Sequence, residues 1–178
     1  MGRTFYDGGV TTVYLGLGSN LGDRRALLGE AVRRLVEHGA IGPDVVRSAL
    51  YETDAVAPEP QPPYLNAVVR GRTSLSPEAL LGACLRVEAE LGRARPPGVE
   101  KAPRTVDIDV LLVGDAVIRT ASLTVPHPRL VERAFVRIPL CDVAEPGLRD
   151  PSTGVTLTMA PPSPAVRKVT GPAGGWGQ

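Results

Sequence analysis

Apolar residues recur along the chain with two different periods, and the changes between them predict alternating strands and helices. A period near 3.6 follows Asp23 to about residue 38, and Asp23 itself predicts the N-cap of this first helix. The run Ser-Pro-Glu at 76–78 predicts a second helix start. Ser is a favoured N-cap, Pro fits the first helical position, and an acid suits the positive end of the helix dipole. This helix is expected to reach about Leu91 and to stop at Gly92.

Four other segments, 12–18, 45–53, 65–73 and 105–113, have the short apolar or alternating patterns of strands. The second and third are expected to pair with each other. The resulting order, β-α-β-β-α-β, is that of the ferredoxin-like split βαβ arrangement in the α+β class. We therefore expect an antiparallel sheet with both helices on one face and ligand-binding loops on the other.

The bulk composition is that of a globular protein, with 178 residues, 43% hydrophobic residues, 22% charged residues and a net charge of +1. This balance argues against a protein that binds nucleic acid or a membrane surface through its overall charge. No apolar run approaches the roughly 20 residues needed to cross a bilayer, and the start lacks the apolar core of a signal peptide. We expect a cytoplasmic monomer whose two cysteines, Cys84 and Cys141, are reduced core thiols.

The chain is expected to hold one catalytic domain over residues 12–160, preceded by a flexible leader over 1–11. Residues 161–178 contain Pro, Gly and Ser with few apolar anchors, so they are expected to form a flexible tail.

The most informative pattern for chemistry is the pair Asp107 and Asp109 in the fourth predicted strand. Strand side chains alternate, so both carboxylates should project from one face about 7 Å apart, while Val106, Ile108 and Val110 enter the core. A divalent cation would relieve the repulsion between two carboxylates. Mg²⁺ accepts one or two carboxylates together with water and phosphate oxygens. Two solvated aspartates on an exposed face remain the alternative.

Basic residues surround this pair in the sequence. The twelve residues 93–104 that precede it contain four cations against the single acid Glu100, and three further basic residues follow the pair. They are Arg93, Arg95, Lys101, Arg104, His127, Arg129 and Arg133. Arginine binds phosphate through two parallel hydrogen bonds. Acidic metal ligands flanked by basic loops match the needs of phosphoryl transfer, although a solvated basic loop is the simpler alternative for the segment 93–104. Mutual repulsion, two prolines and Gly98 predict that this segment orders only when phosphate and metal bind.

A second group of residues flanks the Pro-rich connection between the two central strands, namely Thr53, Tyr64 and Asn66. Tyr supplies a flat stacking face, and a side-chain amide can pair with the edge of a heterocycle. Phe135 also lies near a loop, but the residues alone favour ordinary core packing for it.

Two nucleotide-binding motifs are rejected. The glycines in 16–22 follow a strand, but the third falls one position late for a dinucleotide fingerprint, and no parallel partner strand is evident. The P-loop pattern is absent from the sequence as well.

Five ordered segments resemble the 6-hydroxymethyl-7,8-dihydropterin pyrophosphokinase family of folate biosynthesis. They are Leu15–Asp23, Tyr51–Asp54, Gln61–Asn66, Pro103–Asp109 and Thr124–Leu130 with Arg133–Phe135. The resemblance spans roughly residues 12–145. It implies an enzyme that transfers the diphosphate of ATP to the alcohol of a reduced pterin, with AMP leaving.

The resemblance also implies residue roles. Two Mg²⁺ ions would bind Asp107 and Asp109, and Arg93 and Arg104 would hold the transferring phosphates and take part in catalysis. The pterin would lie between Tyr64 and Phe135, with Thr53 and Asn66 reading its edge. ATP would be bound by a larger set that includes both catalytic arginines: Glu88, Arg93, Arg95, Arg104, Thr124, His127 and Arg133.

This chain departs from the family pattern at three positions. Lys101 and Ala102 replace the Trp-Gly that often precedes the Pro-Arg-Thr run, and Pro128 stands where some relatives have Tyr. The first change removes an aromatic lid, whereas neither change touches the aspartate pair. A non-catalytic ligand-binding module and an RNA-binding domain are competing hypotheses. The first leaves both aspartates without a role, and the second requires exposed strand aromatics and a basic surplus that the sequence lacks.

Overall fold

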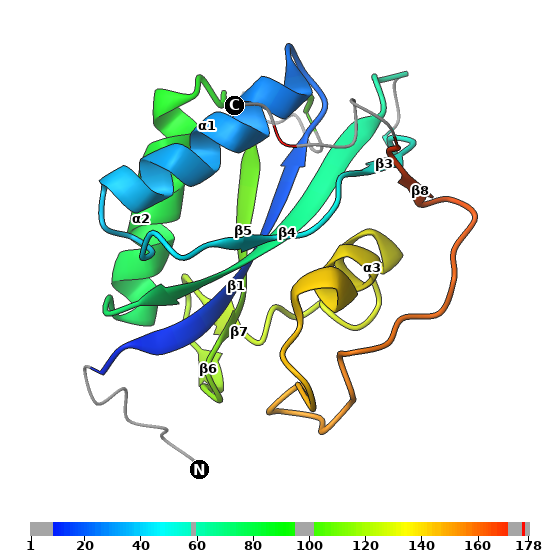
Figure 1. Cartoon of the computed structure of the whole chain (residues 1–178). Coiled ribbons are helices and arrows are strands. Elements are labelled where there is room, and N and C mark those ends of the chain that lie inside the picture. Colours follow the sequence, from blue (N-terminus) through cyan, green and yellow to red (C-terminus); the bar gives the residue numbers. More distant parts are fainter. Residues whose placement is uncertain (1–8, 58–59, 95–101, 171–175, 177–178) are drawn as a thin grey trace.

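The computed structural model describes residues 9–57, 60–94, 102–170 and 176. Its main sheet is antiparallel, in the order β5-β1-β4-β3-β8, with β2 also paired to β4 (Figure 1). The strands of this sheet are β1 (Thr11–Ser19), β2 (Val46–Arg47), β3 (Tyr51–Thr53), β4 (Tyr64–Thr73), β5 (Asp107–Val113) and β8 (Arg167–Lys168). The antiparallel α+β arrangement is as predicted, but the predicted strand over 45–53 divides into β2 and β3.

Both predicted helices form with their predicted caps. α1 (Arg24–Glu37) begins after Asp23, whose carboxylate accepts a hydrogen bond of 3.0 Å from Ala26 N. α2 (Pro77–Glu90) begins after Ser76, and the residue that follows its last turn, Gly92, has φ of +76°. Among the described residues, no helix is long and apolar enough to cross a membrane.

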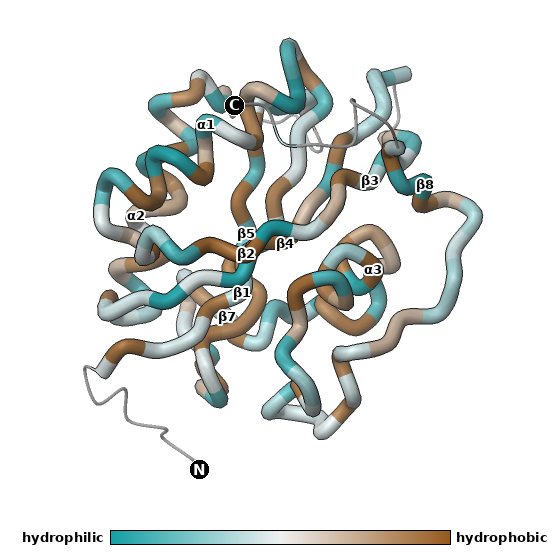
Figure 2. The backbone as a smooth tube through the Cα atoms, viewed as in Figure 1, coloured by the Kyte–Doolittle hydropathy of each residue, from teal (hydrophilic) through white to brown (hydrophobic). Residues whose placement is uncertain are grey.

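α1 and α2 cover one face of the sheet and enclose the larger core. On that face β1 contributes Val13, Leu15 and Leu17, which are at most 3% exposed and pack against buried residues of both helices. Figure 2 shows this pattern as brown apolar segments that recur along the central strands. The alternation of apolar residues predicted this face correctly.

The opposite face carries a helix that the sequence did not predict, α3 (Ala134–Val143). Val136, Leu140 and Val143 pack on Tyr14 and Val68 of the sheet and form a second core. The sequence analysis expected ligand-binding loops on this face, and α3 lies there as well (Figure 1).

Two features of α3 disfavour a helix. Its N-cap residue, Arg133, makes no side-chain capping bond, and Pro139 lies inside it, where proline ordinarily interrupts a helix. Packing against the sheet outweighs both features. A two-stranded ribbon of β6 (Ile118–Arg119) and β7 (Thr124–Val125) precedes α3.

The ends of the predicted domain also differ from expectation. Thr11, placed in the leader, begins β1, and the rest of the leader up to residue 8 lies outside the described residues. The prediction of a flexible tail is wrong for its described part. β8 pairs with β3, and Trp176 Nε1 donates a 2.8 Å hydrogen bond to Ser48 O. Backbone pairing to an open strand edge needs few apolar side chains, so composition gave no sign of it.

Candidate active site

A cleft of about 480 Å³ opens on the α3 face of the sheet, and its lining includes the first residues of α3. Its floor is built by strand register. Gly18 of β1 pairs with Asn66 of β4 on one side and with Asp107 of β5 on the other. Gly16 and Gly18 line this floor, and a methyl group at Gly18 would be in van der Waals contact with the side-chain oxygen of Asn66, at 3.5 Å. The two groups predicted to bind different ligands are thus brought together across a single glycine.

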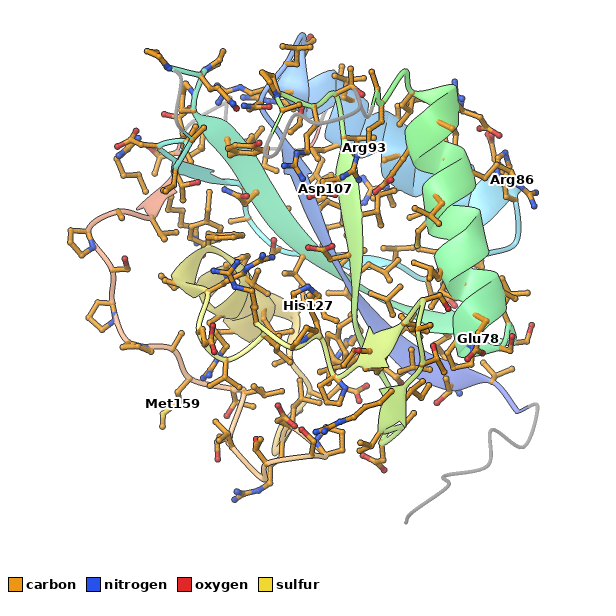
Figure 3. The ribbon with its side chains drawn as sticks, turned by 180° about the vertical axis from the view of Figure 1, so that it is seen from behind. Glu78, Arg86, Arg93, Asp107, His127 and Met159 are labelled. Atoms are coloured by element: carbon orange, nitrogen blue, oxygen red, sulfur yellow. The ribbon has the colours of Figure 1, made fainter. Side chains whose placement is uncertain are left out.

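Asp107 lies at the charged end of the cleft between two arginines. Arg104 Nη1 is 2.6 Å from Asp107 Oδ2, and Arg93 Nη1 contacts Asp107 Oδ1. Figure 3 shows Arg93, at the end of α2, beside Asp107. Arg93 also pairs with Glu88, which is 2% exposed and accepts a 2.7 Å hydrogen bond from Ile108 N. Glu88 therefore fixes both Arg93 and the strand segment between the two aspartates.

Asp109 faces a second pair of basic groups. Arg133 Nη1 is 3.6 Å and His127 Nε2 is 4.0 Å from Asp109 Oδ2. Burial and the nearby Asp107 carboxylate raise the pKa of Asp109 above its ordinary value, against the influence of the surrounding arginines. Two neighbouring carboxylates repel each other, and a bound cation would relieve this repulsion.

The surroundings of His127 favour its neutral form. Its backbone N donates 3.0 Å to Leu111 O, and its Nδ1 accepts a 3.1 Å hydrogen bond from Arg129 N. Burial, Arg133 and Arg129 lower the pKa of His127. The neutral tautomer consistent with this bond carries its proton on Nε2, which faces Asp109.

The other end of the cleft, called the uncharged end here, is built mainly by uncharged side chains, although the guanidinium carbons of Arg104 and Arg133 lie 5.8 and 5.5 Å from the ring centres of Tyr64 and Phe135. Asn66 Nδ2 donates a 3.0 Å hydrogen bond to Thr53 Oγ1, and both residues are buried. Tyr64 and Phe135 line the same end, where Phe135 also packs against the second core. The core packing that the residues alone favoured for Phe135 is present, and its side chain lines the cleft as well. This end offers flat aromatic surfaces and an amide edge, as a planar heterocycle requires.

Some residues predicted to contact the nucleotide either fall outside the described residues or do not line the cleft. Arg95 lies outside the described residues, as does most of the segment 93–104 for which ordering was predicted. Thr124 lies in the small ribbon and does not line the cleft, and Glu88 lies behind β5. Arg129, noted in the sequence only as one of several basic residues, does line the cleft.

Asn20 is buried and connects two loops of the site by hydrogen bonds, a role that the sequence did not predict. Its Oδ1 accepts 2.8 Å from Arg104 N, and its Nδ2 donates 3.0 Å to Gln61 Oε1. It thus joins the loop before β4 to the arginine beside Asp107. The available signal was a side-chain amide within a glycine-rich turn, which was interpreted only as a turn into a helix.

The comparison with protein families decides the assignment. Residues 14–145 match the family model described as 7,8-dihydro-6-hydroxymethylpterin-pyrophosphokinase (HPPK). The chain belongs to this family. The region of the HPPK match contains the floor residues of β1, β4 and β5, together with all of α3.

Curated relatives support the same assignment. A 2-amino-4-hydroxy-6-hydroxymethyldihydropteridine pyrophosphokinase of Bacillus subtilis (strain 168) is 46% identical over 132 residues, covering 74% of this chain and 77% of the relative. The Aquifex aeolicus (strain VF5) protein of the same name is 43% identical over 142 residues, covering 80% of this chain and 85% of the relative.

Solved structures support the fold. Plasmodium falciparum HPPK-DHPS, solved with pteroate, matches with a TM-score of 0.61 over 84% of this chain and 41% of that chain. At 16% identity this likeness concerns the HPPK fold alone.

Proposed function

We propose that this chain transfers the diphosphate of ATP to the hydroxymethyl group of 6-hydroxymethyl-7,8-dihydropterin, giving the pterin diphosphate and AMP in folate biosynthesis. The observation that carries the proposal is the cleft itself. Its floor sets Asp107 and Asp109 beside an uncharged aromatic end, across Gly18. Membership of the HPPK family agrees with this function.

In this proposal the uncharged end holds the pterin. Tyr64 and Phe135 stack on its two faces, while Thr53 and Asn66 form hydrogen bonds with its edge. The bond between Asn66 and Thr53 supports these roles because it fixes the amide in one orientation. The hydroxymethyl group would then point along the floor toward β5.

The charged end would hold the triphosphate. Arg104 and Arg133 line the cleft, and each also pairs with one of the aspartates, so their guanidinium groups are positioned before ligand arrives. Arg93, Arg95 and His127 would complete the nucleotide contacts, with Glu88 orienting Arg93. Positioned cations stabilise the charge that develops on transferring phosphoryl groups.

Asp107 and Asp109 would hold Mg²⁺, and the proposal includes two ions. The described residues contain no cluster of three or more His, Cys, Asp or Glu that could hold a metal alone. Mg²⁺ does not require such a cluster, because water and phosphate oxygens complete its shell. When bound, Mg²⁺ would withdraw charge from the phosphate oxygens.

The reaction forms a bond between the pterin hydroxymethyl oxygen and the β-phosphorus of ATP. The bond from that phosphorus to the oxygen bridging the α-phosphate breaks, and AMP leaves with its electron pair. The alcohol proton is released. The protein supplies alignment of the two substrates across Gly18 and neutralisation of charge by its arginines.

The decisive experiment incubates the purified protein with Mg-ATP and 6-hydroxymethyl-7,8-dihydropterin and measures AMP chromatographically. AMP should form only when the pterin alcohol is present. Omission of the pterin controls for ATP hydrolysis, and Asp109→Asn is the matched variant. AMP release that is independent of pterin, or no release, would contradict the proposal and leave a ligand-binding module as the alternative.

The proposal also includes a monomer that acts in the cytoplasm. Light scattering in solution, with and without both substrates, tests the monomer. A stable dimer at enzyme-assay concentrations would contradict it.

A further inference from the structure

The segment that follows α3 runs along the open side of the cleft. It lies beyond residue 145, where the match to the HPPK family model ends. Ser163, Ala165 and Val166 nevertheless line the cleft together with Phe135. Figure 1 shows the segment, in orange and red, leaving α3 and passing around to β8. Part of the wall of the proposed substrate site is therefore supplied from outside the family-matched region.

The segment is anchored at its start by α3. Arg137, only 6% exposed, donates from Nη2 to Thr156 O at 3.1 Å and also to Met159 O. Leu157 is fully buried in the second core, and its N donates 2.9 Å to Leu148 O. A buried guanidinium bonded to two carbonyls fixes the backbone at this point, because separating them would leave a charge unsatisfied.

A second anchor holds the far end of the segment against β3. Arg167 Nη2 lies 2.9 Å from Asp54 Oδ1 and 3.6 Å from Glu52 Oε1. The backbone contributes as well, since Val169 N donates 2.9 Å to Leu50 O. Asp54 itself lines the cleft, so this anchor lies at its rim.

Between the anchors the chain presents small, uncharged side chains to the cleft. A 3.1 Å hydrogen bond from Val166 N to Ser163 O closes a turn there. Across the rim Val56 is 83% exposed although it also lines the cleft, so an apolar side chain is left uncovered at this place. Apolar side chains at a pocket rim bury surface when they pack on a flat ring, and they provide no hydrogen-bond donor for a phosphate.

We infer that residues 163–166 form the outer wall of the heterocycle end of the cleft and determine which ring it accepts. The inference rests on the proposed function and deepens it, by adding a specificity element to the pterin site. Arg137 and Arg167 are positioning residues, which act by holding this wall in place. The wall should affect recognition of the pterin and leave recognition of ATP unchanged.

The first test compares two tryptophan substitutions in the C-terminal segment. Val166→Trp fills the cleft, whereas Val155→Trp places the same bulk at a residue that is 39% exposed and does not line it. Val166→Trp should raise the KM for 6-hydroxymethyl-7,8-dihydropterin by about tenfold or more, with the KM for ATP unchanged. Val155→Trp should leave both values at wild-type level.

The second test loosens the wall without adding bulk. Arg167→Ala removes the ion pairs to Asp54 and Glu52, and Arg33→Ala is the matched control, removing exposed pairs to Glu30 and Glu37 on α1. Arg167→Ala should raise the pterin KM about threefold, because a mobile wall must be ordered when the pterin binds. Thermal unfolding of both variants checks that the fold is retained, and Arg167→Ala decides the matter if Val166→Trp does not fold.

The outcomes separate the inference from the proposed function. Wild-type protein that forms no AMP overturns the proposed function. If the wild type is active but Val166→Trp and Arg167→Ala behave like their controls, the inference that residues 163–166 form a specificity wall is wrong. A rise in the KM for ATP in place of that for the pterin also overturns it.

Discussion

The two faces of the central sheet are built by the same strands and serve opposite purposes. On β5, Ile108 and Val110 are 3% and 4% exposed and enter the core beneath α1 and α2. Asp107 and Asp109, which alternate with them, line the cleft on the other face. The helix-covered face contributes apolar burial, whereas the cleft face is the one that holds charges close together.

The difference between the faces follows from how far each is covered. α1 and α2 pack over one face, whereas on the other face α3 lies beside an open cleft. In this cleft, burial and the neighbouring carboxylate raise the pKa of Asp109, which means that its charged form is disfavoured in the folded protein. The chemistry is therefore located where the fold gains least from packing, as is common for functional sites.

Asp109→Ala is expected to distinguish the two faces most clearly, because it should abolish most of the activity and leave the fold intact. Loss of a carboxylate at the transferring phosphates should lower kcat by about 10³-fold, the scale of removing one preorganised electrostatic contact. The fold should remain, since no apolar contact is lost. Steady-state AMP formation and thermal unfolding measure the two effects. Near-normal turnover would contradict the metal-binding role.

Asp109 also predicts how stability changes with pH. Because its pKa is raised on folding, the folded protein binds more protons there than the unfolded chain, and stability falls as pH rises through the interval above the ordinary aspartate pKa. Asp109→Asn should therefore unfold at higher denaturant than wild type at neutral pH, in metal-free buffer. The difference in stability between this variant and wild type should narrow as the pH is lowered toward the ordinary aspartate pKa. A difference that widens instead would show that Asp109 stabilises the fold.

The converse substitution on the helix face is Leu28→Ala in α1, at a fully buried side chain. It should lower the free energy of unfolding by about 2–5 kcal/mol through lost burial and a residual cavity. Turnover per folded molecule should stay at wild-type level. Denaturant unfolding measures the loss of stability, and an active-site titration gives the turnover per folded molecule. A loss of turnover without loss of stability would mean that the faces are not independent.

Arg104→Ala tests whether a cation on the cleft face acts mainly in the transition state. We expect kcat to fall by about 10²-fold, with a smaller change in the Kd of a non-hydrolysable ATP analogue. The control is Arg149→Ala, which removes an exposed arginine bonded only to a loop carbonyl among the contacts described for it. Equal losses in kcat and analogue binding would place the role of Arg104 in ground-state binding.

The smallest effect on this face is expected at its uncharged end. Asn66→Ala should weaken pterin binding by about 1–3 kcal/mol, the cost of an unmet hydrogen bond in a buried site. Binding of Mg-ATP should not change. Separate calorimetric titrations of each ligand measure this, and weaker ATP binding with unchanged pterin binding would reverse the assignment of the two ends.

How much could be predicted from the sequence differs between the faces. Strand alternation placed Asp107 and Asp109 together, and side-chain caps located α1 and α2, because both signals are local. α3 was missed because its stability comes from contacts with Val68 and Leu111, which are distant in sequence, and outweighs an interior proline.

The remaining site residues depend on distant contacts. Asn20 meets Gln61 and Arg104 only when the chain is folded, and a buried amide has no periodic signature. The resemblance suggested a nucleotide contact for Glu88. Its position behind β5 depends on the register of α2 against that strand, which the sequence does not specify.

The attachment of Trp176 gives the molecule an optical probe of its own. It is the single tryptophan of the chain, its indole nitrogen bonds Ser48 O, and the guanidinium carbon of Arg47 lies 5.4 Å from the ring centre. Its emission should shift to longer wavelength when this contact with β2 and its neighbour is released into water. Because Trp176 does not line the cleft, fluorescence can report detachment of the C-terminal segment independently of whether substrate is bound.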